Sequence, residues 1–262
     1  MVYKHSEPFY RNIYNEEEVF MYAYKNKLPL MLKGPTGCGK SRFVEKMAFK
    51  LNQHLIQVAC NEETSSVDLI GRYIVYGGDT IWQDGPLTKA VRTDSILYLD
   101  EISEAREDIV VALHPISDYR RTLYIDRTCE ILNASSKFMI VISFNPGYQK
   151  SFKELKPSTR QRFISLQFNY PSVDLEIEIL NIETDIDINI ARLLVLYAQK
   201  IRNLKELELI ETVSTRLLVN AALLIKNGLN IKRSCEVAII YPLTDDLDIQ
   251  ESLIDIANLV FE

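Results

Sequence analysis

The stretch LPLMLKGPTGCGKS, residues 28–41, decides how the rest of the chain is interpreted. Its first six residues form a nearly continuous apolar run, which is typical of a strand covered on both faces of a parallel sheet. The next eight residues fit the pattern G-x-x-x-x-G-K-[ST] at every fixed position, and they are Gly34, Pro35, Thr36, Gly37, Cys38, Gly39, Lys40 and Ser41. A stripe of apolar residues at helical spacing follows. The pattern therefore lies between a strand and a helix, as a phosphate-binding loop requires.

This loop predicts ATP and Mg²⁺ as the cofactors. Glycines let successive backbone N–H groups turn inward around a β-phosphate, and the N-terminus of the following helix adds partial positive charge. Lys40 is expected to reach the β- and γ-phosphate oxygens, and Ser41 is expected to bind Mg²⁺. Cys38 is expected to contribute only its backbone.

Apolar runs alternate with helical patterns over the first 170 residues, which indicates βαβ units and a mostly parallel sheet. The runs at 28–33, 54–59, 95–100 and 138–145 are nearly continuous, so we expect them to be central strands. The run at 163–168 alternates apolar and polar residues instead. That period of two suits a strand at the sheet edge.

The pattern changes after Pro171, where three apolar stripes at helical spacing follow one another. We therefore expect two domains, an α/β nucleotide-binding domain over 1–175 and a small helical domain over 176–262. Two segments interrupt the α/β pattern, and each has β-rich arms around a turn. These segments, 73–82 and 121–132, are predicted to be β-hairpin insertions.

Three polar residues follow directly on predicted strands, at the sheet edge where parallel sheets bind ligands. Asp100 is expected to hold Mg²⁺, partly through water, while Glu101 orients and deprotonates the attacking water. The amide of Asn145 can bond the γ-phosphate or that water. An asparagine before Pro146 also starts turns, and both interpretations of Asn145 can hold at once.

Three arginines are candidates for contact with the γ-phosphate. Arg160 and Arg162 precede the predicted edge strand, too far along the fold to serve their own loop, so they suit the ATP of a neighbouring subunit. Arg216 lies at the start of a helix for which Ser214 can act as the cap. A positive charge there opposes the helix dipole, which favours a phosphate ligand over a solvated surface arginine.

Five segments occur in an order that resembles one known family: GPTGCGKS, ILYLDE, SFNPGYQ, LKPSTRQRF and VSTRLL. The chain is similar to the MoxR branch of the AAA+ ATPases, and within it most of all to the CbbQ/NirQ/NorQ subfamily. The resemblance implies a P-loop AAA+ core with hairpin insertions, followed by a helical lid. It also implies the site roles: Gly34 to Ser41 as Walker A, Asp100 and Glu101 as Walker B, Asn145 as sensor 1, Arg162 as the arginine finger with Arg160 beside it, and Arg216 as sensor 2.

The resemblance further implies a hexameric ring with ATP between subunits, a partner carrying a von Willebrand factor A domain, and a client enzyme. Rubisco is the expected client, as for CbbQ, and a NorQ-like or NirQ-like role in activating or maturing nitric oxide reductase is the alternative. A nucleotide-switched scaffold with little turnover is a weaker alternative. Gly77, Gly78 and Arg127 in the hairpins are candidates for client contact, and a plain structural role is at least as well supported.

The charge balance disfavours a nucleic-acid motor, because 30 Lys+Arg against 36 Asp+Glu leave a net charge of −6 and no overall positive field. The four cysteines lie far apart and only three histidines accompany them, so neither a disulfide framework nor a zinc site is expected. The apolar runs are too short to span a bilayer, and the first residues have no apolar signal core. We therefore expect a cytoplasmic protein without a membrane segment.

Overall fold

The computed structural model describes residues 7–145, 155–204, 209 and 211–261. The chain divides into two compact units. The first comprises Met1–Gly34 with Lys40–Gln167, and the second comprises Phe168–Glu262 with the loop residues Pro35–Gly39. The boundary expected from the sequence, between 175 and 176, stays a prediction.

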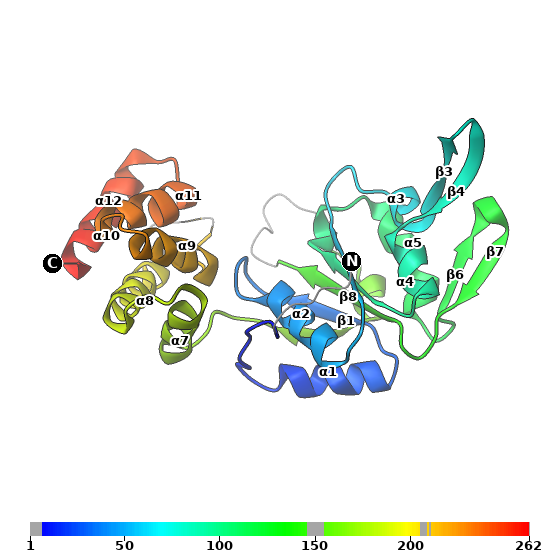
Figure 1. The fold of residues 1–262 in the computed structure, drawn as a ribbon, viewed down its shortest axis with the longest axis horizontal. Coiled ribbons are helices and arrows are strands. Elements are labelled where there is room, and N and C mark those ends of the chain that lie inside the picture. Colours follow the sequence, from blue (N-terminus) through cyan, green and yellow to red (C-terminus); the bar gives the residue numbers. More distant parts are fainter. Residues whose placement is uncertain (1–6, 146–154, 205–208, 210, 262) are drawn as a thin grey trace. The chain divides into compact units, whose positions relative to one another are not determined.

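The first unit is built on a five-stranded sheet in the order β2-β5-β8-β1-β9, with every neighbouring pair parallel. The strands are β1 (Leu30–Lys33), β2 (Leu55–Ala59), β5 (Ile96–Asp100), β8 (Met139–Phe144) and β9 (Ile164–Gln167). This order confirms the predicted parallel sheet, and β9 lies at the edge as its alternating pattern indicated. The α/β architecture expected from the phosphate-loop stretch is therefore present (Figure 1).

One strand prediction is wrong. We expected residues 54–59 to form a central strand, but β2 pairs with β5 on one side and is the last strand of the described sheet on the other. Only Ile56 and Val58 pack against the core from this strand, while Gln57 is exposed. A single polar residue inside an otherwise apolar run was the sign that one face of the strand meets solvent.

Helices of the first unit cover the sheet and its connections. They are α1 (Glu16–Lys25), α2 (Lys40–Lys50), α3 (Ser66–Ile70), α4 (Pro86–Arg92), α5 (Glu107–Ser117) and α6 (Pro157–Arg160), with 3₁₀ turns at Ile102–Glu104 and Asp126–Thr128. Helix α2 begins where the phosphate loop ends, and it buries Phe43, Val44 and Met47 along one face. This buried apolar face packs the helix against the sheet.

Both predicted hairpins are present. Strands β3 (Gly71–Tyr76) and β4 (Asp79–Asp84) pair antiparallel, as do β6 (Thr122–Ile125) and β7 (Glu130–Asn133). Gly77 and Gly78 connect β3 to β4 with φ of 63° and 93°. A two-residue hairpin turn with positive φ at both positions favours glycine there. The two hairpins appear at the right of Figure 1, and the hydroxyl of Tyr73 donates to the carbonyl of Arg127 at 3.2 Å.

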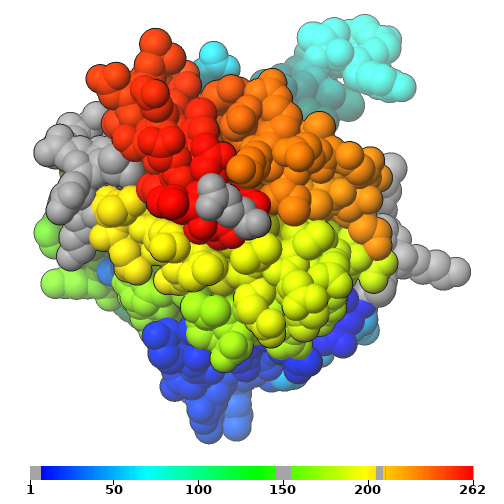
Figure 2. All heavy atoms as spheres, turned by 90° about the vertical axis from the view of Figure 1, so that its left-hand side faces the viewer, coloured from blue at the N-terminus to red at the C-terminus, as the bar shows by residue number. Residues whose placement is uncertain are grey.

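The second unit is helical. Its helices are α7 (Val173–Thr184), α8 (Ile188–Asn203), α9 (Thr215–Lys226), α10 (Ile231–Cys235), α11 (Tyr241–Leu243) and α12 (Leu247–Val260), with a π-helical turn over Glu236–Ile240. The predicted apolar stripes form its core, and Figure 2 shows α12 in red lying against α8 in yellow. Within the residues described, no helix combines the length and apolar character needed to cross a bilayer.

Candidate active site

The phosphate loop leaves β1 at Gly34 and enters α2 at Lys40. The N–H of Gly34 donates to the carbonyl of Phe144 at 3.2 Å, which fixes the loop to the neighbouring strand β8. Gly37 and Gly39 have φ of 69° and 99°, a region that favours glycine, so these two positions need the glycines of the pattern. The ammonium of Lys40, which is buried, donates to the carbonyl of Gly34 at 2.7 Å. The lysine is thereby folded back over the loop that it closes.

Asp100 is the centre of a hydroxyl cluster at the end of β5. The hydroxyl of Ser41, from the start of α2, donates to Oδ2 of Asp100 at 3.2 Å. The hydroxyls of Tyr98 and Ser143 both donate to Oδ1, at 2.7 and 2.5 Å. The oxygens of Ser41 and Tyr98 are 3.3 Å apart. Hydroxyls from two strands and one helix therefore converge on one carboxylate.

Glu101 follows Asp100 in a left-handed backbone conformation, with φ of 56° and ψ of 50°. Non-glycine residues adopt this region at a cost, and such residues gather at functional sites. Its N–H donates to the hydroxyl of Ser143 at 2.8 Å, which holds the turn, and its side chain is exposed. Burial, together with the charges of Asp100 and Glu101, raises the pKa of the nearby Cys60 to about 12, so this thiol stays protonated.

Asn145 follows β8 directly and is half-buried. In the sheet, β8 lies between β5 and β1. Because these strands are parallel, their carboxyl ends form one edge, where Asn145 joins Asp100, Glu101 and the loop that begins at Gly34. The first unit therefore brings together the residues that the sequence predicted at strand ends.

Arg160 and Arg162 lie at the amino-terminal ends of the strands, opposite to the carboxyl ends where the phosphate loop begins. Arg160 ends α6 and Arg162 comes just before β9, whose first residue, Ile164, bonds the carbonyl of Pro29 ahead of β1. They are therefore level with the start of β1, whereas Gly34 follows its end. Four residues of β1 separate the two levels, roughly 13 Å at 3.3 Å per residue.

The side chains of these two arginines are held differently. Arg160 donates its Nε to the carbonyl of Leu155 at 2.7 Å. Arg162 donates one terminal nitrogen to the carbonyl of Ser158, while its Nε is buried and finds no hydrogen-bond acceptor among the described residues. The neighbouring His114 bonds Thr159 at 3.1 Å, and burial with the charge of Arg162 lowers the pKa of this histidine.

Arg216 is the second residue of α9 in the helical unit. Ser214 precedes the helix as predicted, and its hydroxyl accepts the N–H of Leu217 at 3.4 Å. The loop residues of this unit meet the same end of the helix, since a Cβ built on Gly37 would lie 2.7 Å from Cβ of Ser214 and 3.2 Å from Cβ of Arg216. Arg216 therefore lies beside Gly37 within this unit, and its role as a phosphate ligand stays a prediction.

A buried ion pair supports this end of α9. Both terminal nitrogens of Arg202 donate to Glu176, at 2.7 and 2.8 Å, and the hydroxyl of Thr215 donates to the same carboxylate at 2.6 Å. The guanidinium also lies 4.4 Å from the ring centre of Tyr170, whose hydroxyl donates to the carbonyl of Thr36 at 3.2 Å. The cluster therefore ties together α7, α8, the start of α9 and one loop carbonyl.

Sequence reasoning missed several of these side chains. Tyr98 carried a local signal, because it lies two residues before Asp100 and so shares its face of the strand. Ser143 carried a weaker one, a lone hydroxyl in the run FMIVISFN. Glu176 and Arg202 carried none, since they lie 26 residues apart on different helices.

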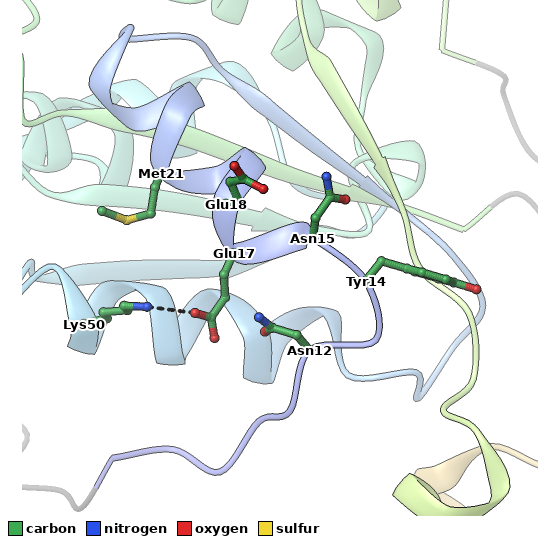
Figure 3. Close-up of a pocket in the computed structure, with 7 residues that line it drawn as sticks. All are labelled: Asn12, Tyr14, Asn15, Glu17, Glu18, Met21 and Lys50. Carbon is green, nitrogen blue, oxygen red and sulfur yellow. Dashed lines mark hydrogen bonds and ion pairs between the residues drawn. The ribbon is translucent and has the colours of Figure 1, made fainter.

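A pocket lies where the N-terminal arm, α1 and the end of α2 meet (Figure 3), and its lining residues are Asn12, Tyr14, Asn15, Glu17, Glu18, Met21 and Lys50. Glu17 is paired with Lys50 at 2.8 Å and with Lys46 at 2.5 Å. Tyr10, nearby in sequence, packs its ring 5.2 Å from that of Phe43. The pocket holds none of the residues predicted for ATP.

The oxygen donors at the end of β5 match Mg²⁺ in kind, because this ion takes hydroxyl and carboxylate oxygens and keeps several waters. Ser41 and Asp100 supply one of each at hydrogen-bond distance. Among the residues that the structure describes, no group of three or more His, Cys, Asp or Glu side chains could hold a metal ion. Because Mg²⁺ is usually bound by one or two protein oxygens together with substrate phosphates, the pair Ser41 and Asp100 suits an ion shared with a phosphate ligand.

Comparisons with known proteins agree with this geometry. The family model AAA domain (dynein-related subfamily) matches residues 29–163, and the model CbbQ/NirQ/NorQ C-terminal matches residues 176–260. Protein NorQ of Paracoccus denitrificans is 52% identical, over 97% of this chain and 94% of its own. Protein CbbQ of Hydrogenophilus thermoluteolus is 50% identical, over 98% of this chain and 96% of its own. A solved RuvB mutant of Thermotoga maritima has a TM-score of 0.56 at 13% identity, covering 93% of this chain and 68% of that one, which shows the shared fold.

Proposed function

The chain belongs to the CbbQ/NirQ/NorQ family of AAA+ ATPases, and from this premise we propose that it hydrolyses ATP to ADP and phosphate in order to remodel a client enzyme. The observation that carries the proposal is the contact between Ser41 and Asp100 at 3.2 Å, directly after the phosphate loop. This contact joins the end of Walker A to Walker B. A P-loop ATPase needs that junction to hold the metal ion of its nucleotide.

The phosphates of ATP are held by the loop from Gly34 to Ser41. Its backbone N–H groups and the N-terminus of α2 face the β-phosphate, and Lys40 leaves the carbonyl of Gly34 to reach the β- and γ-phosphates. Arg216 adds positive charge from the start of α9. These groups bind and orient the triphosphate.

Ser41 and Asp100 would hold Mg²⁺, Asp100 partly through water. The ion would neutralise charge on the β- and γ-phosphate oxygens. Glu101 orients the attacking water and takes its proton, because its exposed carboxylate follows β5 at the edge where the phosphates bind. Asn145 fixes the same water or the γ-phosphate by hydrogen bonding.

Arg162 acts on the ATP of a neighbouring subunit, with Arg160 beside it. Both lie at the amino-terminal ends of the strands, whereas their own phosphate loop begins at the carboxyl end of β1. A trans role therefore fits their position better than a cis role. We infer a homo-oligomer on this basis, a hexameric ring as the family resemblance implies. The resemblance also implies an adaptor with a von Willebrand factor A domain. The cytoplasmic location stays a prediction from the sequence.

Rubisco is the proposed client, in the manner of CbbQ. The second candidate is nitric oxide reductase, because the relative named NorQ is 52% identical and the one named CbbQ is 50% identical. These values are too close to separate the two clients. Both candidate clients are proteins, and the acidic net charge also favours action on protein over nucleic acid.

The ATPase proposal is tested by three variants in a nucleotide-binding assay and a phosphate-release assay. Lys40→Ala should lose ATP binding, because the triphosphate loses its direct cation. Glu101→Gln should bind ATP and release almost no phosphate, while the matched control Glu104→Gln, three residues further on, should keep hydrolysis. Equal loss of ATP affinity in Lys40→Ala and Glu101→Gln would contradict the assigned roles.

The client is tested by reactivation of Rubisco held by an inhibitory sugar phosphate. Wild-type protein with its adaptor and ATP should restore carboxylation, and Glu101→Gln should not. Equal recovery with both proteins would overturn the Rubisco assignment. No recovery with either, combined with nitric oxide reductase maturation that depends on Glu101, would establish the second candidate instead.

A further inference from the structure

Tyr98 and Ser143 lie inside the sheet with no exposed surface, in the segments ILYLDE and SFNPGYQ, and neither has been given a role in the phosphate site. Tyr98 is on β5 and Ser143 is on the adjacent β8. Both donate hydrogen bonds to the same oxygen, Oδ1 of Asp100, at 2.7 and 2.5 Å. Two buried hydroxyls from two strands therefore donate to one carboxylate oxygen.

The two oxygens of Asp100 therefore have different hydrogen-bond partners. Oδ1 is occupied by two hydroxyl donors, which are strong because the acceptor is charged. Oδ2 faces Ser41, the side chain that follows the phosphate loop. Rotation of the carboxylate would break both bonds to Oδ1. The orientation of Oδ2 toward Ser41 is therefore fixed by Tyr98 and Ser143.

The hydroxyl of Tyr98 is not needed for packing. Phenylalanine has the same ring without the hydroxyl, and the partners of that hydroxyl are the polar groups of Asp100 and Ser41. A buried hydroxyl costs free energy unless it is hydrogen-bonded, which makes its presence informative.

Neutral donors are also the appropriate choice for a carboxylate that must bind a cation. A lysine or arginine in place of Tyr98 would cancel the charge of Asp100, whereas hydroxyls orient the carboxylate and leave it negative. Ser143 adds a second function, because its oxygen accepts the N–H of Glu101 at 2.8 Å. One serine thus fixes both the metal-side carboxylate and the turn that carries the proposed general base.

We propose that Tyr98, together with Ser143, is a positioning residue that presents Oδ2 of Asp100 to a Mg²⁺ shared with Ser41. The proposal rests on the ATPase function proposed above and adds two residues to it. It concerns metal affinity in the nucleotide complex rather than folding. Its consequence is that the metal dependence of nucleotide binding changes when the hydroxyl is lost.

The test is a titration of the full-length protein with a fluorescent ATP analogue, at a series of Mg²⁺ concentrations and in EDTA. Tyr98→Phe should need about tenfold more Mg²⁺ for half-maximal metal-dependent binding, the effect of one lost hydrogen bond to a charged group. Its affinity in EDTA should match wild type. Tyr197→Phe is the control, because Tyr197 is equally buried and donates to the carbonyl of Leu253 at 3.0 Å in the helical unit.

An unchanged Mg²⁺ requirement in Tyr98→Phe would overturn the proposal, and so would an equal shift in Tyr197→Phe, which would reveal a general loss of stability. Ser143→Ala provides a second variant, with the same expected shift, if thermal unfolding shows that Tyr98→Phe does not fold. A wild-type protein that binds the analogue equally with Mg²⁺ and EDTA would refute the positioning role alone. Failure of wild type to bind in either condition would refute the ATPase proposal.

Discussion

Asp100 in the first unit and Glu176 in the helical unit each accept three hydrogen bonds from side chains, but the donors differ. Glu176 is fully buried and receives two of its bonds from Arg202, so its charge is cancelled inside the protein. Asp100 receives all three from hydroxyls, and its side chain is only half-buried at the edge of the sheet. Its charge is oriented without being cancelled.

The difference separates a structural carboxylate from one that can bind a cation. A buried carboxylate that shares a guanidinium holds helices together, and removing either partner leaves the other charge unpaired. A carboxylate held by neutral donors keeps the charge that a divalent ion requires. The donors, rather than the acid itself, therefore distinguish the two functions. Glu176→Ala tests this comparison directly, and variants of Arg162 and His114 extend it to other charged side chains.

The largest effect is expected for Glu176→Ala, which leaves the guanidinium of Arg202 buried without its carboxylate. The free energy of unfolding of the helical unit should fall by about 3–5 kcal/mol. Denaturant unfolding followed by circular dichroism measures it. The matched control is Asp174→Ala, which removes an exposed carboxylate from the same helix and should cost at most about 1 kcal/mol. Similar losses in both variants would show that the pair does not stabilise the unit.

Arg162→Ala should have the next largest effect, on turnover instead of stability. Arg202 has acceptors for all its nitrogens, whereas the Nε of Arg162 has no acceptor in the described part of the chain. Phosphate release should fall about a hundredfold, a cautious value for an arginine finger. ATP binding and unfolding should stay close to wild type, and a large loss of stability would assign Arg162 to the structural class.

Mixing tests whether Arg162 acts in trans. Subunits with Arg162→Ala keep an intact phosphate loop, and subunits with Lys40→Ala keep an intact arginine. Rings that contain both should form some sites that combine the intact groups, so part of the hydrolysis should return. Confirmed mixed rings without any recovery would contradict a trans arginine finger.

The smallest effect concerns His114, which lies beside Arg162. Burial and the charge of Arg162 lower its pKa in the folded protein, while Asp118 acts in the opposite direction. Below the ordinary pKa of histidine the unfolded chain takes up the proton more readily, so stability should decline as pH falls from 7 to 5. In His114→Gln that decline should be shallower. The control is His54→Gln, because His54 is exposed. An identical slope in His114→Gln and wild type would contradict the prediction.

Much of the candidate site could be predicted because its residues lie at fixed places in the chain. The phosphate loop is continuous in sequence, and Asp100, Glu101 and Asn145 each follow an apolar run directly. The parallel sheet then brings strand ends together whatever the details of packing. The edge position of β9 was also predictable, since its alternating side chains meet two different environments. The prediction for residues 54–59 failed because the apolar side chains around Gln57 outweighed its signal.

The sequence by itself determined the parallel sheet, the hairpins, the phosphate loop and the identity of the acids, because each depends on residues close together in the chain. Only the tertiary structure decided which donors surround each acid. The hydroxyl of Ser143 comes to Asp100 from a strand 43 residues away, and Arg202 comes to Glu176 from another helix. Such partners are chosen by strand order and helix packing, which no local pattern encodes. They decide whether a carboxylate is neutralised within the fold or remains available to a cation.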